Sequence, residues 1–329
     1  MRKGIIASLC LAAVMMIASV ARAEGTARSE GPRIVATIFP LWDWTREILG
    51  TESADLVLLL DGGTDLHSYQ PSVEDVAKIC ACDLLVCVGG ESERWIEDAL
   101  RNVTNEGQIV VRLLEALGDR VKDEDHYEEH EDHEHREGHG HHEGHGHHEE
   151  RGRDEHAWLS LRNAEQACRA IADALSRIGP ARAEAYAANA DRYVESLREL
   201  DDRYREVVRG ASRRTILFAD RFPFRYLVDD YGLTWHAAFP GCSAETEASF
   251  ATVARLAGKV DELGLPCVLT VEGARHEIAQ AVVASTKRKD QRVLVMDSMQ
   301  GTTTRDAREG ATYLRIMEKD LEVLKAALE

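Results

Sequence analysis

The stretch RAEAYAANADRYVESLRELDDRYREVVR, residues 182–209, contains neither glycine nor proline, with Pro180 shortly before it and Gly210 directly after it. Apolar side chains recur alternately every four and three residues, which predicts one long helix with a single apolar face. These side chains are Tyr186, Ala190, Tyr193, Leu197, Leu200, Tyr204 and Val207. Such a helix would be roughly 42 Å long, enough to run along a whole small domain. We therefore predict a connecting helix over residues 181–210, bounded by the proline and the glycine.

The sequence on each side of this helix repeats one pattern, in which short aliphatic runs alternate with helical segments. The first half has strand candidates at 33–37, 55–60, 83–89 and 108–112, and helix candidates that include 41–50 and 92–102. The second half has strand candidates at 215–219, 233–239, 267–272 and 292–296, and helix candidates at 246–263, 275–287 and 310–328. Aliphatic runs this continuous are typical of parallel strands buried on both faces, and their alternation with helices predicts βα units.

The fold that we predict is α/β, with two lobes of parallel β-sheets flanked by helices and a metal site in the cleft between the lobes. The first lobe comprises residues 24–180 and the second lobe residues 211–329. The long helix joins them as a rigid backbone on which both lobes pack. The alternative is a coiled-coil dimer, in which the apolar face of the helix would meet a second chain.

A histidine-rich segment interrupts the first lobe at HEHREGHGHHEGHGHHEE, residues 133–150, which contains GHGHHE twice in succession. Its surroundings, residues 119–156, have fifteen acidic and five basic residues and account for −10 of the chain's net charge of −18. Because such a sequence has almost no apolar side chain to bury, we expect a disordered loop over about 119–152.

Imidazoles among carboxylates can bind divalent metals, so we predict that this loop collects metal with low affinity. The alternative is an inert low-complexity insert. The collecting histidines would be His126, His130, His133, His135, His139, His141, His142, His145, His147 and His148.

The N-terminus has the features of a secretory signal peptide: Arg2 and Lys3, then an apolar run, then a small-residue cleavage site that ends at Ala23. We expect residues 1–23 to be removed and the mature protein to be periplasmic. The alternatives are an uncleaved membrane anchor and a lipoprotein attached through Cys10.

Six cysteines follow the cleavage site, and an exported protein can oxidise them. Cys242 and Cys267 are far enough apart to close a useful loop, but spacing does not determine their pairing. Cys80 and Cys82 lack the CxxC spacing of a redox or zinc motif, so we expect small buried side chains beside a strand.

Four side chains with metal-binding chemistry follow predicted strands or the histidine-rich segment. His67 lies in DGGTDLHSYQPSVEDV after the strand at 55–60, and His156 lies in RDEHAWLSLRNA. Asp220 and Asp297 directly follow strands of the second half. Because ligands of parallel α/β sheets bind beyond the carboxyl ends of the strands, these two imidazoles and two carboxylates can meet at one edge.

These segments resemble the solute-binding proteins of zinc and manganese ABC importers, of the ZnuA, AdcA and TroA type, over nearly the whole mature chain. The resemblance is carried by IVATIFPLWDWTREILG, GTDLHSYQPSVEDV, VGGESERWIEDAL, DEHAWLSLRNA, the long central helix, DDYGL and VLVMDSMQG. It implies that His67 and His156 are the first two metal ligands and that Asp297 is the last. A histidine-rich insert ahead of the second ligand is a feature of the family's zinc-handling members.

The third ligand departs from the family pattern. The position of the family's His or Glu, counted back from Tyr231, falls on Arg221. A guanidinium stays protonated and does not bind a metal. We take Asp220, one residue earlier, as the substitute, with His236, Glu272 and a water molecule as alternatives.

The resemblance and the donor set together imply an extracytoplasmic protein that captures Zn²⁺ as cargo and delivers it to an ABC importer. Its partners would be a membrane permease and the cytoplasmic ATPase of that permease. Zinc is preferred over manganese because imidazole suits zinc and manganese favours oxygen. A manganese-specific member and an exported zinc buffer are the alternatives. An enzyme such as a zinc hydrolase is not expected, because HExxH, GxSxG and P-loop motifs are absent from the sequence. We expect a monomer that binds no nucleic acid, since the chain is acidic and has no basic stripe.

Overall fold

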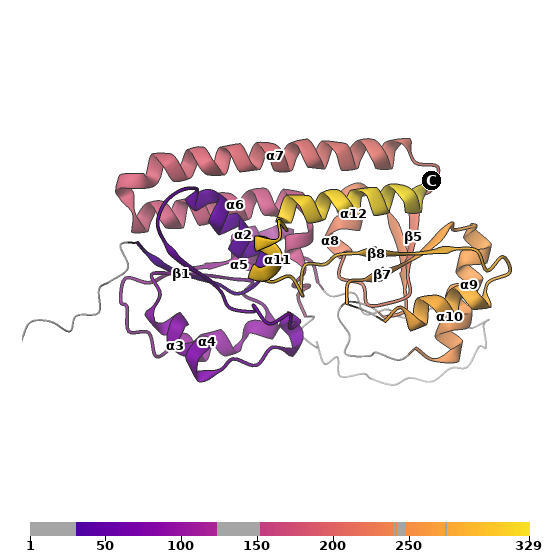
Figure 1. Ribbon diagram of the computed structural model, residues 1–329, viewed down its shortest axis with the longest axis horizontal. Coiled ribbons are helices and arrows are strands. Elements are labelled where there is room, and N and C mark those ends of the chain that lie inside the picture. The colour runs from indigo at the N-terminus through magenta and orange to yellow at the C-terminus, as the bar shows by residue number, and fades with distance from the viewer. Residues whose placement is uncertain (1–30, 124–151, 240, 242–247, 274) are drawn as a thin grey trace, which may run out of the picture.

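The computed structural model describes residues 31–123, 152–239, 241, 248–273 and 275–329 (Figure 1). The predicted signal peptide 1–23, the ten histidines of the histidine-rich segment and Cys242 lie outside these residues. No helix in the described part of the chain is both long and apolar enough to cross a membrane.

Each half of the chain forms a four-stranded sheet in which all strands are parallel. The first sheet, in the order β2-β1-β3-β4, consists of β1 (Arg33–Ala36), β2 (Asp55–Leu58), β3 (Leu84–Cys87) and β4 (Ile109–Arg112). The second sheet, in the order β6-β5-β7-β8, consists of β5 (Thr215–Phe218), β6 (Thr234–Ala237), β7 (Cys267–Val271) and β8 (Arg292–Met296). The strand order is therefore the same in both lobes, and the predicted α/β class is confirmed.

Helices lie between the strands of each lobe and also follow its last strand. In the first lobe they are α2 (Phe39–Leu49), α3 (Val73–Ala81), α4 (Trp95–Leu100), α5 (Leu113–Leu117) and α6 (Leu161–Ile178). In the second lobe they are α8 (Arg225–Tyr231), α9 (Phe250–Leu263), α10 (Glu277–Ser285), α11 (Thr304–Arg308) and α12 (Tyr313–Leu328). The elements differ from the sequence prediction mainly at their ends, because capping contacts rather than periodicity set the first and last residues.

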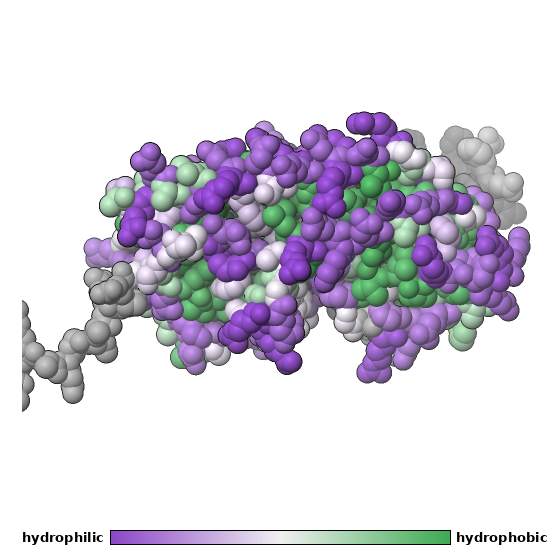
Figure 2. All heavy atoms as spheres, turned by 45° about the horizontal axis from the view of Figure 1, so that its top comes forward, coloured by the Kyte–Doolittle hydropathy of each residue, from purple (hydrophilic) through white to green (hydrophobic). Residues whose placement is uncertain are grey.

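The predicted connecting helix is α7 (Ala183–Gly210), which runs along both lobes with α6 and α12 beneath it (Figure 1). Its predicted apolar face is buried as far as Tyr204, and the exposed opposite face is hydrophilic (Figure 2). At the end of the helix Val208 is buried and Val207 only partly so, contrary to the predicted stripe. A helix of 3.6 residues per turn drifts away from a strict seven-residue repeat, which explains this shift. Because the stripe packs within the chain, it is not available for the alternative coiled-coil dimer.

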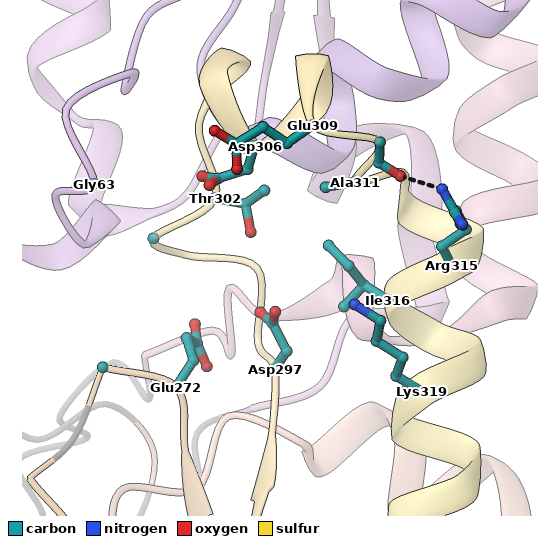
Figure 3. A pocket seen from close by; sticks show the side chains of 13 residues that line it. Gly63, Glu272, Asp297, Thr302, Asp306, Glu309, Ala311, Arg315, Ile316 and Lys319 are labelled. Carbon is teal, nitrogen blue, oxygen red and sulfur yellow. Dashed lines mark hydrogen bonds between the residues drawn. The ribbon is translucent and has the colours of Figure 1, made fainter.

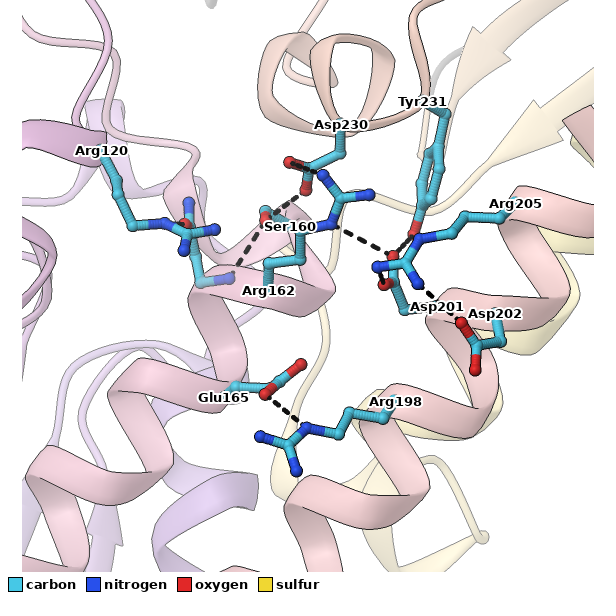
Figure 4. A network of polar contacts seen from close by, with 11 residues as sticks. Arg120, Ser160, Arg162, Glu165, Arg198, Asp201, Asp202, Arg205, Asp230 and Tyr231 are labelled. Atoms are coloured by element: carbon cyan, nitrogen blue, oxygen red, sulfur yellow. Dashed lines mark hydrogen bonds and ion pairs between the residues drawn. The ribbon is translucent and has the colours of Figure 1, made fainter.

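A polar network ties α6 of the first lobe to α7 and to α8 of the second lobe (Figure 4). The Arg162 guanidinium lies 3.5 Å from a carboxylate oxygen of Asp201 and 3.4 Å from one of Asp230. The Ser160 hydroxyl donates to Asp230 at 2.5 Å, and the Tyr231 hydroxyl donates to Asp201 at 2.8 Å. These contacts join the lobes on the side of the connecting helix and oppose their separation there.

The C-terminal helix α12 also contacts the first lobe. The Tyr313 backbone N–H donates to Asp43 on α2 at 2.9 Å, and the Tyr313 hydroxyl donates to the Trp158 carbonyl at 2.7 Å. The Tyr313 ring packs edge-on against Trp44, with centroids 5.0 Å apart. One apolar core therefore runs from β1 through α7 to α12, and the second lobe has a smaller core of its own beneath α9 and α10.

The cysteines of the described residues are buried free thiols: Cys80, Cys82, Cys87, Cys168 and Cys267. The expectation for Cys80 and Cys82 is confirmed, since both pack beside β3. Cys267 is a buried free thiol among the described residues, and Cys242, with which it could close a loop, lies outside them.

Shortening a buried side chain at the centre of α7 should destabilise the whole protein. Leu197 is fully buried, so Leu197→Ala should lower the free energy of unfolding by about 2–5 kcal/mol through lost burial and a cavity. Urea unfolding followed by circular dichroism would measure this. The matched control is Glu195→Ala on the exposed face of the same helix, which should change stability by less than about 0.5 kcal/mol. Equal effects of the two changes would contradict a packed connecting helix.

Candidate metal centre

Two copies of one short motif present the candidate histidines. In Asp65-Leu66-His67 and in Asp154-Glu155-His156, the aspartate side chain accepts the backbone N–H of the histidine two residues later, at 2.9 Å in both cases. This local turn, formed by an aspartate and the backbone N–H two residues on, fixes the loop before each histidine. The short helix η1 (Leu66–Ser68) holds His67, and η4 (Ala157–Leu159) follows His156 directly.

Each imidazole is also held through its Nδ1 atom. His156 Nδ1 lies 2.8 Å from Asp154 Oδ1, and His67 Nδ1 lies 2.7 Å from the Ser92 hydroxyl oxygen. When Nδ1 carries the proton in both rings, both Nε2 atoms keep their lone pairs for a ligand. The carboxylate of Asp154 orients an imidazole in the way found at many protein metal sites.

The two Nε2 atoms face each other at 3.1 Å. Two nitrogen ligands at about 2.0–2.1 Å from a tetrahedral zinc would lie roughly 3.3 Å apart, so the observed separation is close to that of a shared zinc ion. The contact is a hydrogen bond when one Nε2 carries a proton, and with both Nδ1 atoms protonated it instead turns two lone pairs toward the same point, where a cation can bind. His156 is only 1% exposed, so little water reaches this point.

A buried carboxylate lies behind the histidine pair. Glu155 Oε1 accepts the Ser92 backbone N–H at 2.7 Å, and Glu155 Oε2 lies 3.7 Å from His67 Nδ1. That second oxygen is buried and makes no hydrogen bond within the described part of the chain. Gly90 is required here because a Cβ atom at this position would lie 2.3 Å from the Glu155 carboxylate. Glu155 thus adds negative charge next to a site suited to a cation.

Glu93 extends this acidic layer inward. Its carboxyl group is buried and accepts the Gly89 backbone N–H at 2.8 Å. Burial, with a smaller contribution from the nearby Glu155, raises the pKa of Glu93 to about 7. Glu93 is therefore close to the point of titration at neutral pH, and it is next in sequence to Ser92, which contacts His67.

The second lobe meets both histidine loops through the carboxyl ends of its strands. After β5, the Arg221 guanidinium donates to Asp65 at 2.7 Å, beside His67. After β8, the Ser298 carbonyl accepts the Trp158 indole N–H at 2.9 Å, beside His156. Burial alone would raise the pKa of Asp65, but the His67 backbone N–H and Arg221 outweigh it and lower that pKa. Asp65 is thus a carboxylate held between the two lobes.

Asp220 lies at this same edge, but its carboxylate has protein partners. One oxygen accepts the Arg221 backbone N–H at 2.8 Å, and the other accepts the Thr270 hydroxyl at 2.6 Å. A metal bond to Asp220 would have to share or replace one of these contacts.

Asp297 and Glu272 line a cavity of about 630 Å³ between the lobes, with Gly63 of the first lobe on its far side and Lys319 of α12 beside them (Figure 3). Burial, and next the charge of Glu272, raise the pKa of Asp297 to about 6. Glu272 is held by the Ser298 backbone N–H at 2.7 Å and the Ser298 hydroxyl at 2.6 Å. Glu272 therefore braces the loop after β8 that carries Asp297.

Of the four candidate ligands, the structure brings the two histidines together and places the two aspartates on the facing lobe. Within the described ranges, no three His, Cys, Asp or Glu side chains are gathered closely enough to hold a metal ion. His236, an alternative third ligand, lies within β6 at the outer edge of the second sheet. Burial, with Lys259 and Arg255, lowers the pKa of His236.

The model of one protein family, described as the periplasmic component A of a zinc-uptake complex, matches residues 34–327 of this chain. The chain belongs to the ZnuA family. Both the resemblance noted in the sequence and the two-lobed fold agree with this assignment. The family consists of metal-binding transport proteins and not of enzymes, in line with the expectation from the motifs.

Individual relatives support the same placement. Zinc-binding protein AdcA of Streptococcus pyogenes serotype M1 is 27% identical over 99% of this chain, and the chain spans 61% of that relative's length. The high-affinity zinc uptake system protein ZnuA of Bacillus subtilis is 26% identical, over 93% of this chain and 91% of its own length. The crystal structure of the Zn(II)-bound ZnuA-like domain of Streptococcus pneumoniae AdcA is similar at a TM-score of 0.69 and 27% identity, covering 91% of this chain and 99% of that domain.

Several residues that shape the site were not found from the sequence. The sequence could have indicated Asp65 and Asp154, since each lies two residues before a candidate histidine. Ser92 and Glu93 had none, because they come from a loop whose approach to the histidines depends on the folded sheet. The same holds for the partnership of Arg221 with Asp65, which joins residues 156 positions apart.

The raised pKa of Glu93 predicts a stability change with a definite sign. Because the folded-state pKa lies above the ordinary 4.5, the stabilisation from Glu93 is full below about pH 4.5 and is lost as the pH rises through about 7. Glu93→Gln cannot ionise, so it should be more stable than the parent protein at pH 8, by roughly 1–3 kcal/mol, and the gain should disappear near pH 4.5. Thermal unfolding without metal at both pH values would measure this.

The control for this experiment is Glu106→Gln, an exposed carboxylate of the same lobe, which should leave the pH dependence unchanged. A Glu93→Gln variant that parallels the parent protein at every pH would show that the carboxyl titrates normally.

Proposed function

We propose that this protein is an extracytoplasmic solute-binding protein that captures Zn²⁺ and delivers it to an ABC-type importer. The observation that supports this most directly is the pair of Nε2 atoms of His67 and His156, 3.1 Å apart, with both Nδ1 atoms already held. Membership of a zinc-uptake family and the zinc-binding names of the relatives point the same way. Zinc is the transported cargo, so the proposed function is binding and release and involves no covalent chemistry.

The first lobe contributes the preformed half of the site. His67 and His156 are oriented by Ser92 and Asp154, so little rearrangement is needed when zinc arrives. The second lobe contributes carboxylates, and Asp220 and Asp297 are the proposed ligands from that side. A dication between these groups would accept both Nε2 lone pairs and relieve the repulsion between Asp297 and Glu272.

Zinc is favoured over manganese by the chemistry of the preformed half. Imidazole nitrogen binds zinc more tightly than manganese, which prefers oxygen donors. A site whose oriented ligands are two imidazoles should therefore bind zinc more tightly than manganese, which argues against a manganese-specific protein. An exported buffer would use the same ligands, but the placement in an uptake family favours transfer to a transporter.

The remaining parts of the proposal concern two segments outside the described residues and the partner proteins of the importer. The signal peptide 1–23 would direct export, and the mature monomer would act in the periplasm. The histidine-rich segment would bind zinc loosely and raise its concentration near His156. A membrane permease would receive the loaded protein, and the cytoplasmic ATPase of that permease would drive zinc inward.

The two histidines should dominate zinc affinity. His67→Ala and His156→Ala should each weaken the tight site at least a hundredfold, because each removes one of very few ligands, a loss of roughly 3 kcal/mol or more. Competition with a chelator of known zinc affinity would measure the dissociation constant. His236→Ala is the matched control, since His236 lies at the outer edge of the second sheet. Retention of tight zinc binding after either ligand change would refute the proposed site.

The histidine-rich segment should be separable from the tight site. Deleting residues 126–148 should lower the number of zinc ions bound per protein and leave one tight site with an unchanged dissociation constant. Isothermal titration with zinc would record both quantities. If the deletion removed tight binding, collection and capture would not be separate functions of the chain.

A further inference from the structure

The cavity between the lobes reaches from the surface of the protein to the loop that carries Asp297. Its volume is about 630 Å³, and its lining residues include the buried Thr302 and Ile316 as well as the exposed Gly301 and Lys319 (Figure 3). Because both exposed and buried residues line it, the cavity connects solvent with the interior of the protein.

The inner end of this cavity is next to the histidine pair. Ser298, which follows Asp297 directly, accepts the Trp158 indole N–H through its carbonyl at 2.9 Å. The Trp158 ring in turn packs against the His156 imidazole, with centroids 5.3 Å apart. Two contacts therefore lead from the cavity wall to one proposed zinc ligand, and Asp297, another proposed ligand, is itself part of the wall.

The rim of the cavity is formed where a loop of each lobe meets the other. Gly63 of the first lobe and Gly301 of the second both line the cavity, and a Cβ atom added at Gly63 would lie 3.7 Å from the Gly301 carbonyl oxygen. In the same two loops, Asp61 accepts the Thr304 backbone N–H at 2.6 Å and the Thr304 hydroxyl at 2.5 Å. Asp61 is exposed, so these two hydrogen bonds hold the loops together at the surface.

The charge of the cavity walls favours the approach of a cation. On the other side of the site, zinc would approach His67 past the Arg221 guanidinium, which is paired with Asp65. A passage with an excess of negative charge raises the local concentration of cations. Four acidic and two basic side chains line the cavity, an excess of two negative charges when all are ionised: Glu272, Asp297, Asp306 and Glu309, with Arg315 and Lys319.

We propose that this cavity is the route by which zinc enters and leaves the site, and that the contact between Asp61 and Thr304 limits how far the rim opens. The route presupposes the proposed zinc-binding function. It affects rates only, because a passage changes how fast zinc arrives and departs, whereas the affinity depends only on the free and the bound states.

Narrowing the cavity should slow binding and release equally. A Cβ atom added at Gly301 would meet nothing beyond its chain neighbours within 4 Å, so a larger side chain can be placed there. Gly301→Leu should lower both the association and the dissociation rate constant about fivefold or more, with a dissociation constant within about twofold of the parent's. Stopped-flow mixing of Zn²⁺ with the metal-free mature chain, followed by tryptophan fluorescence, would measure association. Mixing the loaded protein with excess chelator would measure release.

The matched control is Gly258→Leu. Gly258 is exposed on α9, and a Cβ atom added there also meets nothing within 4 Å, so both rate constants should stay unchanged. Ala311→Leu enlarges a side chain at another point of the cavity wall and should repeat the slowing. Parental rates in Gly301→Leu and Ala311→Leu would overturn the proposed route. A weaker affinity with an unchanged association rate would also overturn it, since the cavity would then belong to the bound state.

Loosening the rim should have the opposite effect. Asp61→Ala removes both hydrogen bonds to Thr304, so it should raise both rate constants about threefold or more and leave the dissociation constant within about twofold. Asp98→Ala removes an exposed carboxylate of the same lobe on α4 and should change neither rate. Parental rates in Asp61→Ala would refute the role of this contact at the rim.

Failure of the proposed route is distinguishable from failure of the proposed function. If the parent protein binds one zinc ion tightly and the variants at Gly301 and Asp61 match its rates, the function stands and zinc takes another path. If the parent protein itself has no tight zinc site, the proposed function and the route fall together.

Discussion

Burial of one face of α7 is the constraint on which the rest of the structure depends. The helix is continuous over both lobes, and its apolar face packs on α6 and α12 within a single core. Because each lobe is attached to the same rigid element, the lobes cannot drift apart independently. The contacts of Arg162 with Asp201 and Asp230 add a polar bridge on the same side. The carboxyl ends of the two parallel sheets are thereby kept against each other, and the site forms where they meet.

The candidate site gathers imidazole nitrogens and carboxylates where the two lobes meet. Two imidazole nitrogens face each other at 3.1 Å, a buried oxygen of Glu155 lies behind them, and Asp297 is ionised with difficulty beside Glu272. Burial of these polar groups beside the apolar core costs free energy unless they are paired. Under the proposed function, a dication between the lobes would interact favourably with all of these groups at once.

Arg221 provides a direct contact between the two lobes in this member of the ZnuA family. At the position where the sequence resemblance implies a third ligand, this chain has Arg221, whose guanidinium pairs with Asp65. Asp65 also accepts the backbone N–H of His67. The lobes are therefore joined by an ion pair even when no metal connects them. Closure around zinc would then be a small adjustment of loops that already touch, rather than a wide hinge motion.

The sequence alone determined the α/β class, the two matching lobes and the connecting helix, because hydrophobic periodicity is a local property that survives in the folded chain. It also determined His67 and His156 as candidates, since each lies in a motif that resembles a known family. The tertiary structure decided which groups surround them. Ser92, Glu93 and Arg221 act on residues far away in the chain, and sequence spacing carries no information about such contacts. The contact of Arg221 with Asp65 is the clearest case: it forms because the carboxyl ends of the two sheets face each other. That arrangement is set by how the strands pair and how both lobes pack on α7, and not by the order of the residues in the chain.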